Sequence, residues 1–317
     1  MATAIRIGIS SCLLGNQVRY DGGHQLDPFL TDTLGRFFEF VPVCPEAECG
    51  LGAPRETMRL VGDPEHPRLL TTRTGIDHTE RMLAWSRAKV AELAGEGLHG
   101  FIFKAKSPSS GMERVKVYPL ASGGLPKRVG VGLFARVFME HFPLLPVEDE
   151  GRLHDLGLRE NFIERIFALK RWRTAKAAAT VKGLIAFHSS HKLQIMAHSL
   201  PHYRAMGRLV ARTEAKPLAT LYNEYEAMLM AALRLLATEK KQVNVLHHLL
   251  GYFKKVLSPS EKEEMLAIID QYRQGLLPLL VPITLINHTV RKYGQGYLAQ
   301  QTYLHPQPLE LQLRNHA

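Results

Sequence analysis

Residues 5–15, IRIGISSCLLG, join an apolar, β-rich run to a loop that ends in glycine. This pattern predicts a buried β-strand followed by a tight turn. Runs of the same kind recur at 36–44 (RFFEFVPVC), 98–106 (LHGFIFKAK) and 115–118 (VKVY). Residues 78–94 and 130–142 instead carry apolar side chains at helical spacing. The alternation predicts an α/β fold with a mostly parallel, Rossmann-like sheet.

The pattern changes at residues 143–155, PLLPVEDEGRLHD. This segment combines prolines with a cluster of acids and has no periodicity, which is typical of a domain boundary. Almost everything beyond it has helical spacing. We therefore predict an α/β domain at 1–150 and an all-helical domain at 151–317, with residues 304–317 as a tail.

Charge is distributed unevenly along the 317 residues, whose net charge is +10. Residues 1–150 hold 17 Lys and Arg against 18 Asp and Glu, whereas residues 151–317 hold 23 against 12. A domain as basic as the second is expected to attract a polyanion, usually nucleic acid.

No apolar run approaches the roughly 18 residues that span a bilayer. The N-terminal run is predicted to be a strand rather than a signal peptide. We therefore expect a soluble, cytoplasmic protein with no membrane partner, and the sequence indicates no obligate protein partner.

The cysteines number only three, Cys12, Cys44 and Cys49. Thiols stay reduced in the cytoplasm, and thiolates are soft ligands that suit zinc or an iron–sulfur cluster. Structural zinc normally closes its shell with four ligands. A cubane cluster held by three cysteines instead leaves one iron open, as catalysis requires. The alternative is that all three are inert core thiols.

Polar side chains follow the predicted strands. Cys12, Cys44 and Ser107 each come directly after one, so their loops are expected to meet on one rim of the sheet. Ser107, Ser109 and Ser110 form a hydroxyl-rich loop that can orient a polar ligand or transfer a proton, although an ordinary turn also explains the pattern.

The segment VRYDGG follows Cys12 and contains Arg19 and Asp21. These two side chains either line the same site or pair with each other on the surface, and the pattern alone leaves both possibilities open.

Two clusters of basic residues lie in the helical half. They predict RNA or DNA contact through phosphates, and the alternative is a solvated basic face. The first cluster is Lys170, Arg171, Arg173 and Lys176, and the second is Arg204, Arg208 and Arg212 at i, i+4 and i+8.

Several stretches together resemble the thiouracil desulfidase family. They are GISSCLLGNQVRYDGG (8–23), PVCPE (42–46), GLGAPRE (50–56) and KSPSSGMERVKVY (106–118). This resemblance covers roughly residues 5–150. The helical half, from RLHDLGLRENFIERIF onward, resembles the YbgA-type C-terminal domain of two-domain members, which look like tRNA 4-thiouridine desulfidases. The resemblance implies an oxygen-sensitive 4Fe–4S cluster held by three cysteines, whose free iron captures the sulfur of a thiolated base.

The family's motifs carry over to particular positions. Its cluster ligands map onto Cys12 and Cys44, the acid after PVCP maps onto Glu46, and the first serine of SPSxG maps onto Ser107. Stand-alone members have their third cysteine where this chain has Ser110. Here Cys49 stands where those members usually have glycine, so we predict that it supplies the third thiolate.

The function implied is a non-redox, 4Fe–4S-dependent tRNA 4-thiouridine desulfidase in which the cluster acts as a Lewis acid. Glu46 would be the general base or proton shuttle, and Ser107 would hydrogen-bond the ring. The alternatives are a desulfidase for free thiouracil and a non-catalytic, metal-containing RNA-binding protein.

Overall fold

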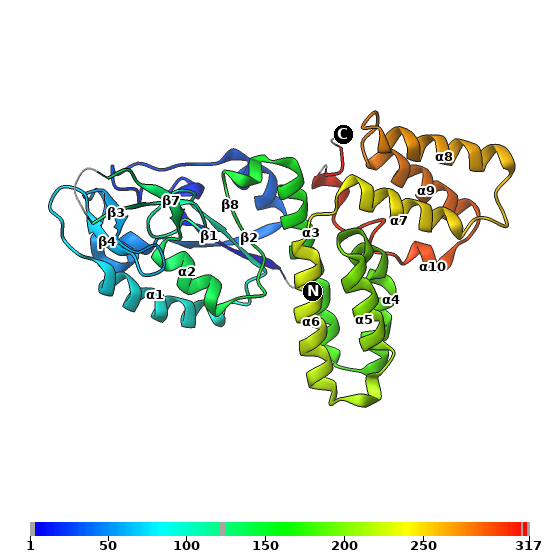
Figure 1. Ribbon diagram of the computed structural model, residues 1–317, viewed down its shortest axis with the longest axis horizontal. Helices are drawn as coiled ribbons and strands as arrows, with labels where there is room; N and C mark the ends of the chain where they lie inside the picture. Colours follow the sequence, from blue (N-terminus) through cyan, green and yellow to red (C-terminus); the bar gives the residue numbers. More distant parts are fainter. Residues whose placement is uncertain (1–3, 121–123, 312, 316–317) are drawn as a thin grey trace. The chain divides into compact units, whose positions relative to one another are not determined.

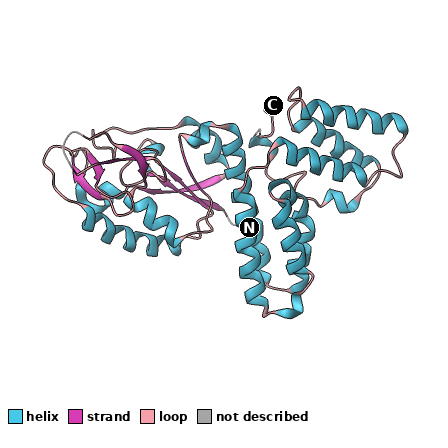
Figure 2. Cartoon of the chain, in the orientation of Figure 1, coloured by secondary structure: helices cyan, strands magenta, loops and turns pink. Residues whose placement is uncertain are grey.

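The computed structural model describes residues 4–120, 124–311 and 313–315, and it divides the chain into two compact units, Met1–Asp155 and Leu156–Ala317 (Figures 1 and 2). The first unit is α/β and the second is helical. The predicted fold class is therefore confirmed.

Sheet A of the first unit is parallel throughout. Its strands are β1 (Ile5–Ser10), β2 (Phe38–Val43), β5 (Gly100–Phe103) and β8 (Val147–Asp149), in the order β2-β1-β5-β8. The chain therefore passes from β1 to β2 on one side of β1 and later crosses to β5 on the other side. This reversal is the switch point at which open α/β sheets leave a crevice.

The core of the first unit is aromatic. Helices α1 (Thr79–Ala94) and α2 (Leu133–His141) lie side by side along the sheet (Figure 1). Phe101 and Phe103 of β5 contact Phe134 and Phe138 of α2. Gly8 is required beneath them, because a Cβ there would lie 2.2 Å from the Phe101 ring.

A second sheet, sheet B, corrects one prediction. Its strands are β3 (Met58–Val61), β4 (Arg68–Thr71), β6 (Val115–Tyr118) and β7 (Lys127–Gly130), in the order β4-β3-β6-β7, and only β3 and β6 run parallel. Residues 115–118 were therefore wrongly assigned to the parallel sheet. Their alternation of buried and exposed residues belongs to a sheet with one solvated face.

The predicted boundary segment also contains structure. Residues 147–149 form β8 at the edge of sheet A, where Glu148 and Asp149 are buried. Arg152 pairs with Glu148, and its backbone N–H donates to Asp149. Acids satisfied in this way belong inside the domain, and the first unit extends to Asp155.

The helical unit has two packing centres. Around Trp172 lie Phe187, Tyr222 and Tyr225, at ring-centroid distances of 4.9 to 5.3 Å. The second centre collects apolar side chains of the later helices. The helices are α3 (Leu156–Ala178), α4 (Val181–His198), α5 (Leu200–Val210), α6 (Leu218–Arg234), α7 (Glu239–Gly251), α8 (Pro259–Arg273), α9 (Leu280–Lys292) and α10 (Gly296–Ala299). Within the described ranges, no helix has the length and apolar character needed to cross a membrane.

The C-terminal segment is not a free tail. Leu304 and Leu311 are buried, and Arg314 is only 4% exposed. Arg314 pairs with Glu160 at 3.2 Å and donates to the carbonyl oxygen of Tyr303 at 2.7 Å. The polar composition that indicated a tail instead supplies buried ion pairs.

Candidate active site

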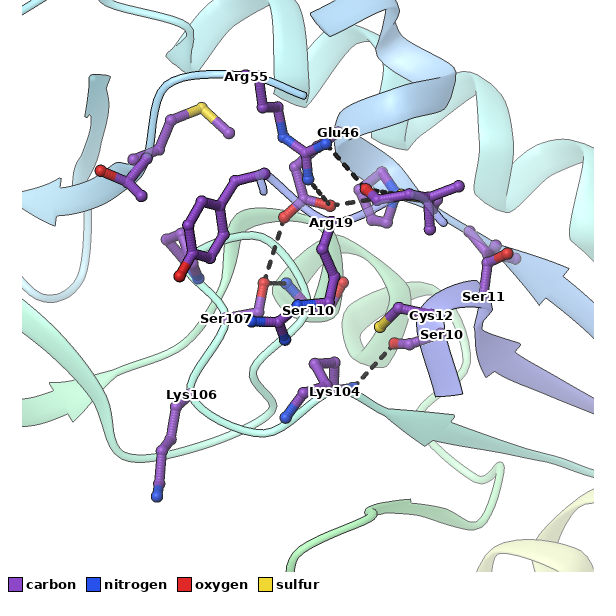
Figure 3. A pocket seen from close by; sticks show the side chains of 18 of the residues that line it. Ser10, Ser11, Cys12, Arg19, Glu46, Arg55, Lys104, Lys106, Ser107 and Ser110 are labelled. Carbon is purple, nitrogen blue, oxygen red and sulfur yellow. Dashed lines mark hydrogen bonds and ion pairs between the residues drawn. The ribbon is translucent and has the colours of Figure 1, made fainter. Parts of the chain in front are cut away.

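A pocket of about 320 Å³ lies at the carboxyl ends of β1, β2 and β5 (Figure 3). Its walls come from the loops after these strands, at residues 10–12, 43–46 and 104–110, and from residues 18–20 and 55–58. This is the crevice expected at the switch point of the sheet. Cys12, Cys44 and Ser107 share the pocket, as their positions after strands predicted.

Glu46 presents a carboxylate to the pocket and is held from several sides. Its Oε1 accepts hydrogen bonds from Ser107 Oγ at 3.3 Å and Ser109 Oγ at 2.5 Å. Its Oε2 lies 3.6 Å from Nη2 of Arg55 and 3.7 Å from Sγ of Cys44. The carboxylate therefore has one fixed orientation beside a thiol.

The serine loop is organised around Ser107. Its hydroxyl donates to Glu46 and accepts from the backbone N–H groups of Ser109 and Ser110. Ser107 and Ser110 line the pocket, whereas Ser109 is fully buried and faces Glu46. Ser109 thus fixes the carboxylate, and Ser107 combines that role with access to a ligand.

Arg19 and Asp21 pair with each other but differ in their access to the pocket. Arg19 lines the pocket, and Asp21 is an exposed residue that pairs with it at 3.5 Å and accepts the N–H of Gly23. Both possibilities left open by the sequence are therefore met in part, because Arg19 reaches the site and Asp21 supports it from outside.

Two of the three thiols face the pocket. Cys12 follows β1 and is half-buried, and Cys44 follows β2, with its Sγ donating to the carbonyl oxygen of Val18 at 3.8 Å. Burial is the main cause that raises the pKa of Cys12 to about 11 and that of Cys44 to about 12. Such thiols stay protonated and inert unless a metal displaces the proton.

Cys49 lies on the other side of the same loop. It is 7% exposed and packs in the apolar cluster of Leu60, Met82 and Val117, and it is not among the residues that line the pocket. Its Sγ donates to the carbonyl oxygen of Glu46 at 3.4 Å, and burial raises the pKa of its thiol. Ser110 of the serine loop, by contrast, lines the pocket.

These residues suit a cluster better than a single ion. Among the described residues, no group of three or more His, Cys, Asp and Glu side chains could hold one metal ion. A 4Fe–4S cluster, however, takes one thiolate per iron and spreads its ligands more widely. Cys44 Sγ lies 3.7 Å from the Glu46 carboxylate, Cys49 Sγ lies 3.4 Å from the Glu46 carbonyl oxygen, and Cys12 lines the same pocket as Glu46.

Some pocket residues were missed by the sequence reasoning. Arg55 donates to the carbonyl oxygens of Val18 and Gly52 and so joins two loops beside Glu46. The sequence feature that could have identified Arg55 is its place in GLGAPRE, residues 50–56, one of the stretches that resemble the desulfidase family. Lys104 lines the pocket and pairs with Glu150, whose other oxygen accepts the N–H of Ala105 at 2.6 Å.

The first basic cluster of the helical unit is largely occupied within the protein. Arg171 donates to Nε2 of His191 at 3.0 Å and to the carbonyl oxygen of Pro306 at 2.7 Å, and burial lowers its pKa to about 10. Lys176 pairs with Glu226 and donates to Asn223, while Lys170 and Arg173 are half-buried. Arg171 therefore has donors occupied within the protein, and its contact with RNA stays a prediction.

The second basic cluster is exposed but does not form one helical row. Arg204 and Arg208 lie on α5, which ends at Val210, so Arg212 lies beyond it. A groove of about 570 Å³ between α4 and α5 is lined by Arg204, Arg208, Lys192 and Tyr203.

Comparison with known proteins divides the chain in the same way. Residues 7–150 match the family described as 2-thiouracil desulfurase, and residues 192–308 match the family described as protein of unknown function (DUF1722). The uncharacterized protein YbgA of Escherichia coli is 35% identical over 153 residues, which are 48% of this chain and 90% of that protein.

Among solved structures, the 4Fe–4S-dependent thiouracil desulfidase TudS is similar. The match has 27% identity and a TM-score of 0.40, and it covers 49% of this chain and 97% of TudS.

Proposed function

Because the chain belongs to the family of Escherichia coli YbgA and carries a 2-thiouracil desulfurase-like domain at residues 7–150, we propose that it is an iron–sulfur-dependent desulfidase acting on 4-thiouridine in tRNA. The reaction replaces the C=S sulfur with the oxygen of water and releases hydrosulfide. No electron is transferred in this exchange. The observation that carries the proposal is the Glu46 carboxylate, fixed beside Cys44 in a pocket that Cys12 also lines.

Cys12, Cys44 and Cys49 would hold a 4Fe–4S cluster. When bound, the cluster supplies an open iron that acts as a soft Lewis acid on the C=S bond. The support for this ligand set is that Cys12 and Cys44 line the pocket, while Cys49 Sγ lies 3.4 Å from the carbonyl oxygen of Glu46 in the same loop as Cys44.

Glu46 accepts the proton of the attacking water. A general base must lie within hydrogen-bond reach of that proton, and Glu46 lines the pocket with its orientation set by Ser107, Ser109 and Arg55. The proton is then available for the departing sulfur. Ser107 lines the pocket, so its hydroxyl proton can turn from Glu46 to the base ring while Ser109 keeps the carboxylate in place.

The helical unit would hold the tRNA through its phosphates. Arg204 and Arg208 are exposed along the groove between α4 and α5, where Lys192 adds a third cation and Tyr203 an aromatic ring. Phosphate contacts of this kind position a nucleic acid without reading its sequence. The thiolated base must leave its stack to enter the pocket, at a cost of a few kcal/mol.

The second candidate is a desulfidase for free thiouracil, which the description of the matching family favours. The two functions differ in the role of the basic helical unit. Under the first it binds substrate, and under the second it is unrelated to the reaction.

Anaerobically purified protein assayed on thiolated tRNA and on free thiouracil separates them. A kcat/KM at least tenfold higher for tRNA supports the proposal. The second candidate would be established if Arg204→Glu turned over free thiouracil as fast as the wild type did and the wild type showed no preference for tRNA.

A further inference from the structure

A basic groove lies beside the pocket in the first unit. Its volume is about 760 Å³, and it shares Met58, Ala105, Lys106 and Pro108 with the pocket wall. Its charged lining consists of six basic side chains and two acidic ones. They are Arg59, Lys106, Arg114, Lys116, Arg128 and Arg152, with Glu113 and Asp149. Since residues 1–150 are close to neutral overall, the positive charge is concentrated here.

The floor of the basic groove is the outer face of sheet B. Leu60 and Val117 point into the core on one face, and strand alternation places Arg59 and Lys116 on the other. Lys116 and Arg128 are direct cross-strand partners on β6 and β7. Like charges directly opposite each other destabilise a sheet, so the fold maintains this arrangement against a cost.

Most of these cations are uncompensated. Lys106, Arg114, Lys116 and Arg128 are exposed and form no ion pair with any residue in the described ranges. By contrast, Arg152 pairs with Glu113 and Glu148. The four free cations are therefore available to an anion from solution.

The backbone shows strain at the same place. Lys106 and Arg114 have φ values of 64° and 53°, in the left-handed region that favours glycine. This conformation is unfavourable for residues with a Cβ, and such strain clusters at ligand clamps. Holding two basic side chains in this conformation beside a pocket indicates a binding role rather than a turn requirement.

Arg59 and Tyr118 add a flat surface to the groove. The Arg59 guanidinium lies 5.0 Å from the centroid of the Tyr118 ring. Its buried Nε finds no acceptor among the described residues, and buried donors of this kind usually have a partner. Aromatic rings inside a positive groove are the typical platform for single-stranded nucleic acid.

We propose that the basic groove holds the phosphate backbone of RNA next to the thiolated nucleotide, while the base itself enters the pocket. This inference rests on the proposed function and deepens it, because it makes the first unit itself selective for a polynucleotide. Free thiouracil has no phosphate and would gain nothing from the groove. The continuity of groove and pocket at Lys106 provides the path from backbone to base.

The first test compares Arg128→Glu with Lys127→Glu in the full-length protein. Both residues are exposed on β7, but only Arg128 lines the groove. The probe is a single-stranded RNA oligonucleotide with one 4-thiouridine, measured for binding and for kcat/KM against the free nucleoside. Arg128→Glu should weaken RNA binding roughly tenfold and reduce the slope of log K against log salt by about 0.7. Lys127→Glu should change the RNA affinity and the salt slope far less.

The second test uses Arg114→Gly. Glycine relieves the left-handed strain, so folding is not impaired, while the charge is removed. We expect a thermal midpoint no lower than that of the wild type together with weaker RNA binding. A stabilised variant with unchanged RNA affinity would overturn the proposal.

The outcomes separate this inference from the proposed function. Equal losses for Arg128→Glu and Lys127→Glu, or no loss for either, would overturn the groove even if the enzyme desulfurates RNA. Selective loss for Arg128→Glu would support the groove even if no desulfidase activity were found, because RNA binding is measured directly.

Discussion

Replacing Glu46 by glutamine removes the proposed base while keeping its shape. The amide oxygen of Glu46→Gln can still accept from Ser107 and Ser109, which contact Oε1 in the wild type. The amide nitrogen would face Arg55, whose guanidinium lies 3.6 Å from Oε2. The pocket should therefore survive with a modest loss of stability, about 1–3 kcal/mol for the lost charged contact.

The effect on turnover should be far larger. General-base catalysis contributes about 10²–10⁴-fold, which corresponds to roughly 3–5 kcal/mol of the activation barrier. We expect kcat to fall by this factor, with KM little changed and with iron content equal to that of the wild type. The assay is anaerobic release of hydrosulfide, with iron counted on the same sample.

A matched control is Glu48→Gln. Glu48 lies two residues away, accepts the N–H of Cys44 at 2.7 Å and does not line the pocket. Its variant should retain wild-type turnover. Turnover within tenfold of wild type in Glu46→Gln would refute a base role, and loss of iron in that variant would make Glu46 a structural residue.

Three further predictions follow from the structure. Binding of tRNA should weaken steeply between low and moderate salt if phosphates dominate, and a flat response in a filter-binding titration would contradict this. Burial alone would raise the pKa of Glu164, but His198, Arg314 and Gln194 together lower it to about 2 from 4.5. Ionised Glu164 therefore stabilises the fold above about pH 4.5, and about 3 kcal/mol of this stability is lost as the pH falls toward 2. Denaturant titrations at several pH values should show that the stability of Glu164→Gln depends less on acid than that of the wild type. The same acid dependence in both proteins would refute this assignment. Gly8→Ala should destabilise the protein by about 1–3 kcal/mol, since the added Cβ meets the Phe101 ring. Gly251→Ala should leave stability unchanged, because the space around Gly251 is open. Equal thermal midpoints for the two variants would contradict this packing.

The sequence predicted the strands that continuous apolar runs encode. Strands β1 and β5 are largely buried, and β2 is an apolar run at the sheet edge, so their positions and the shared rim for Cys12, Cys44 and Ser107 could be read from residue order. Sheet B could not be recognised as a separate sheet, because only residues 115–118 were predicted as one of its strands and these strands contain charged residues such as Arg59 and Lys116.

Side-chain direction was also beyond the sequence. Arginine is usually a surface residue, but Arg171 donates a hydrogen bond to the carbonyl oxygen of Pro306, which lies 135 positions away along the chain. Cys49 shares a loop with Cys44, yet a glycine at φ 85° follows it and its side chain packs behind the pocket wall. Contacts of this kind depend on tertiary packing rather than on local pattern.

The cluster is the central claim, and an iron and sulfide count after anaerobic purification tests it most directly, on the wild type and on Cys49→Ser. The account predicts about four irons and four sulfides per chain in the wild type and loss of the cluster in the variant. Zinc in place of iron in the wild type, or a full cluster in Cys49→Ser, would contradict it.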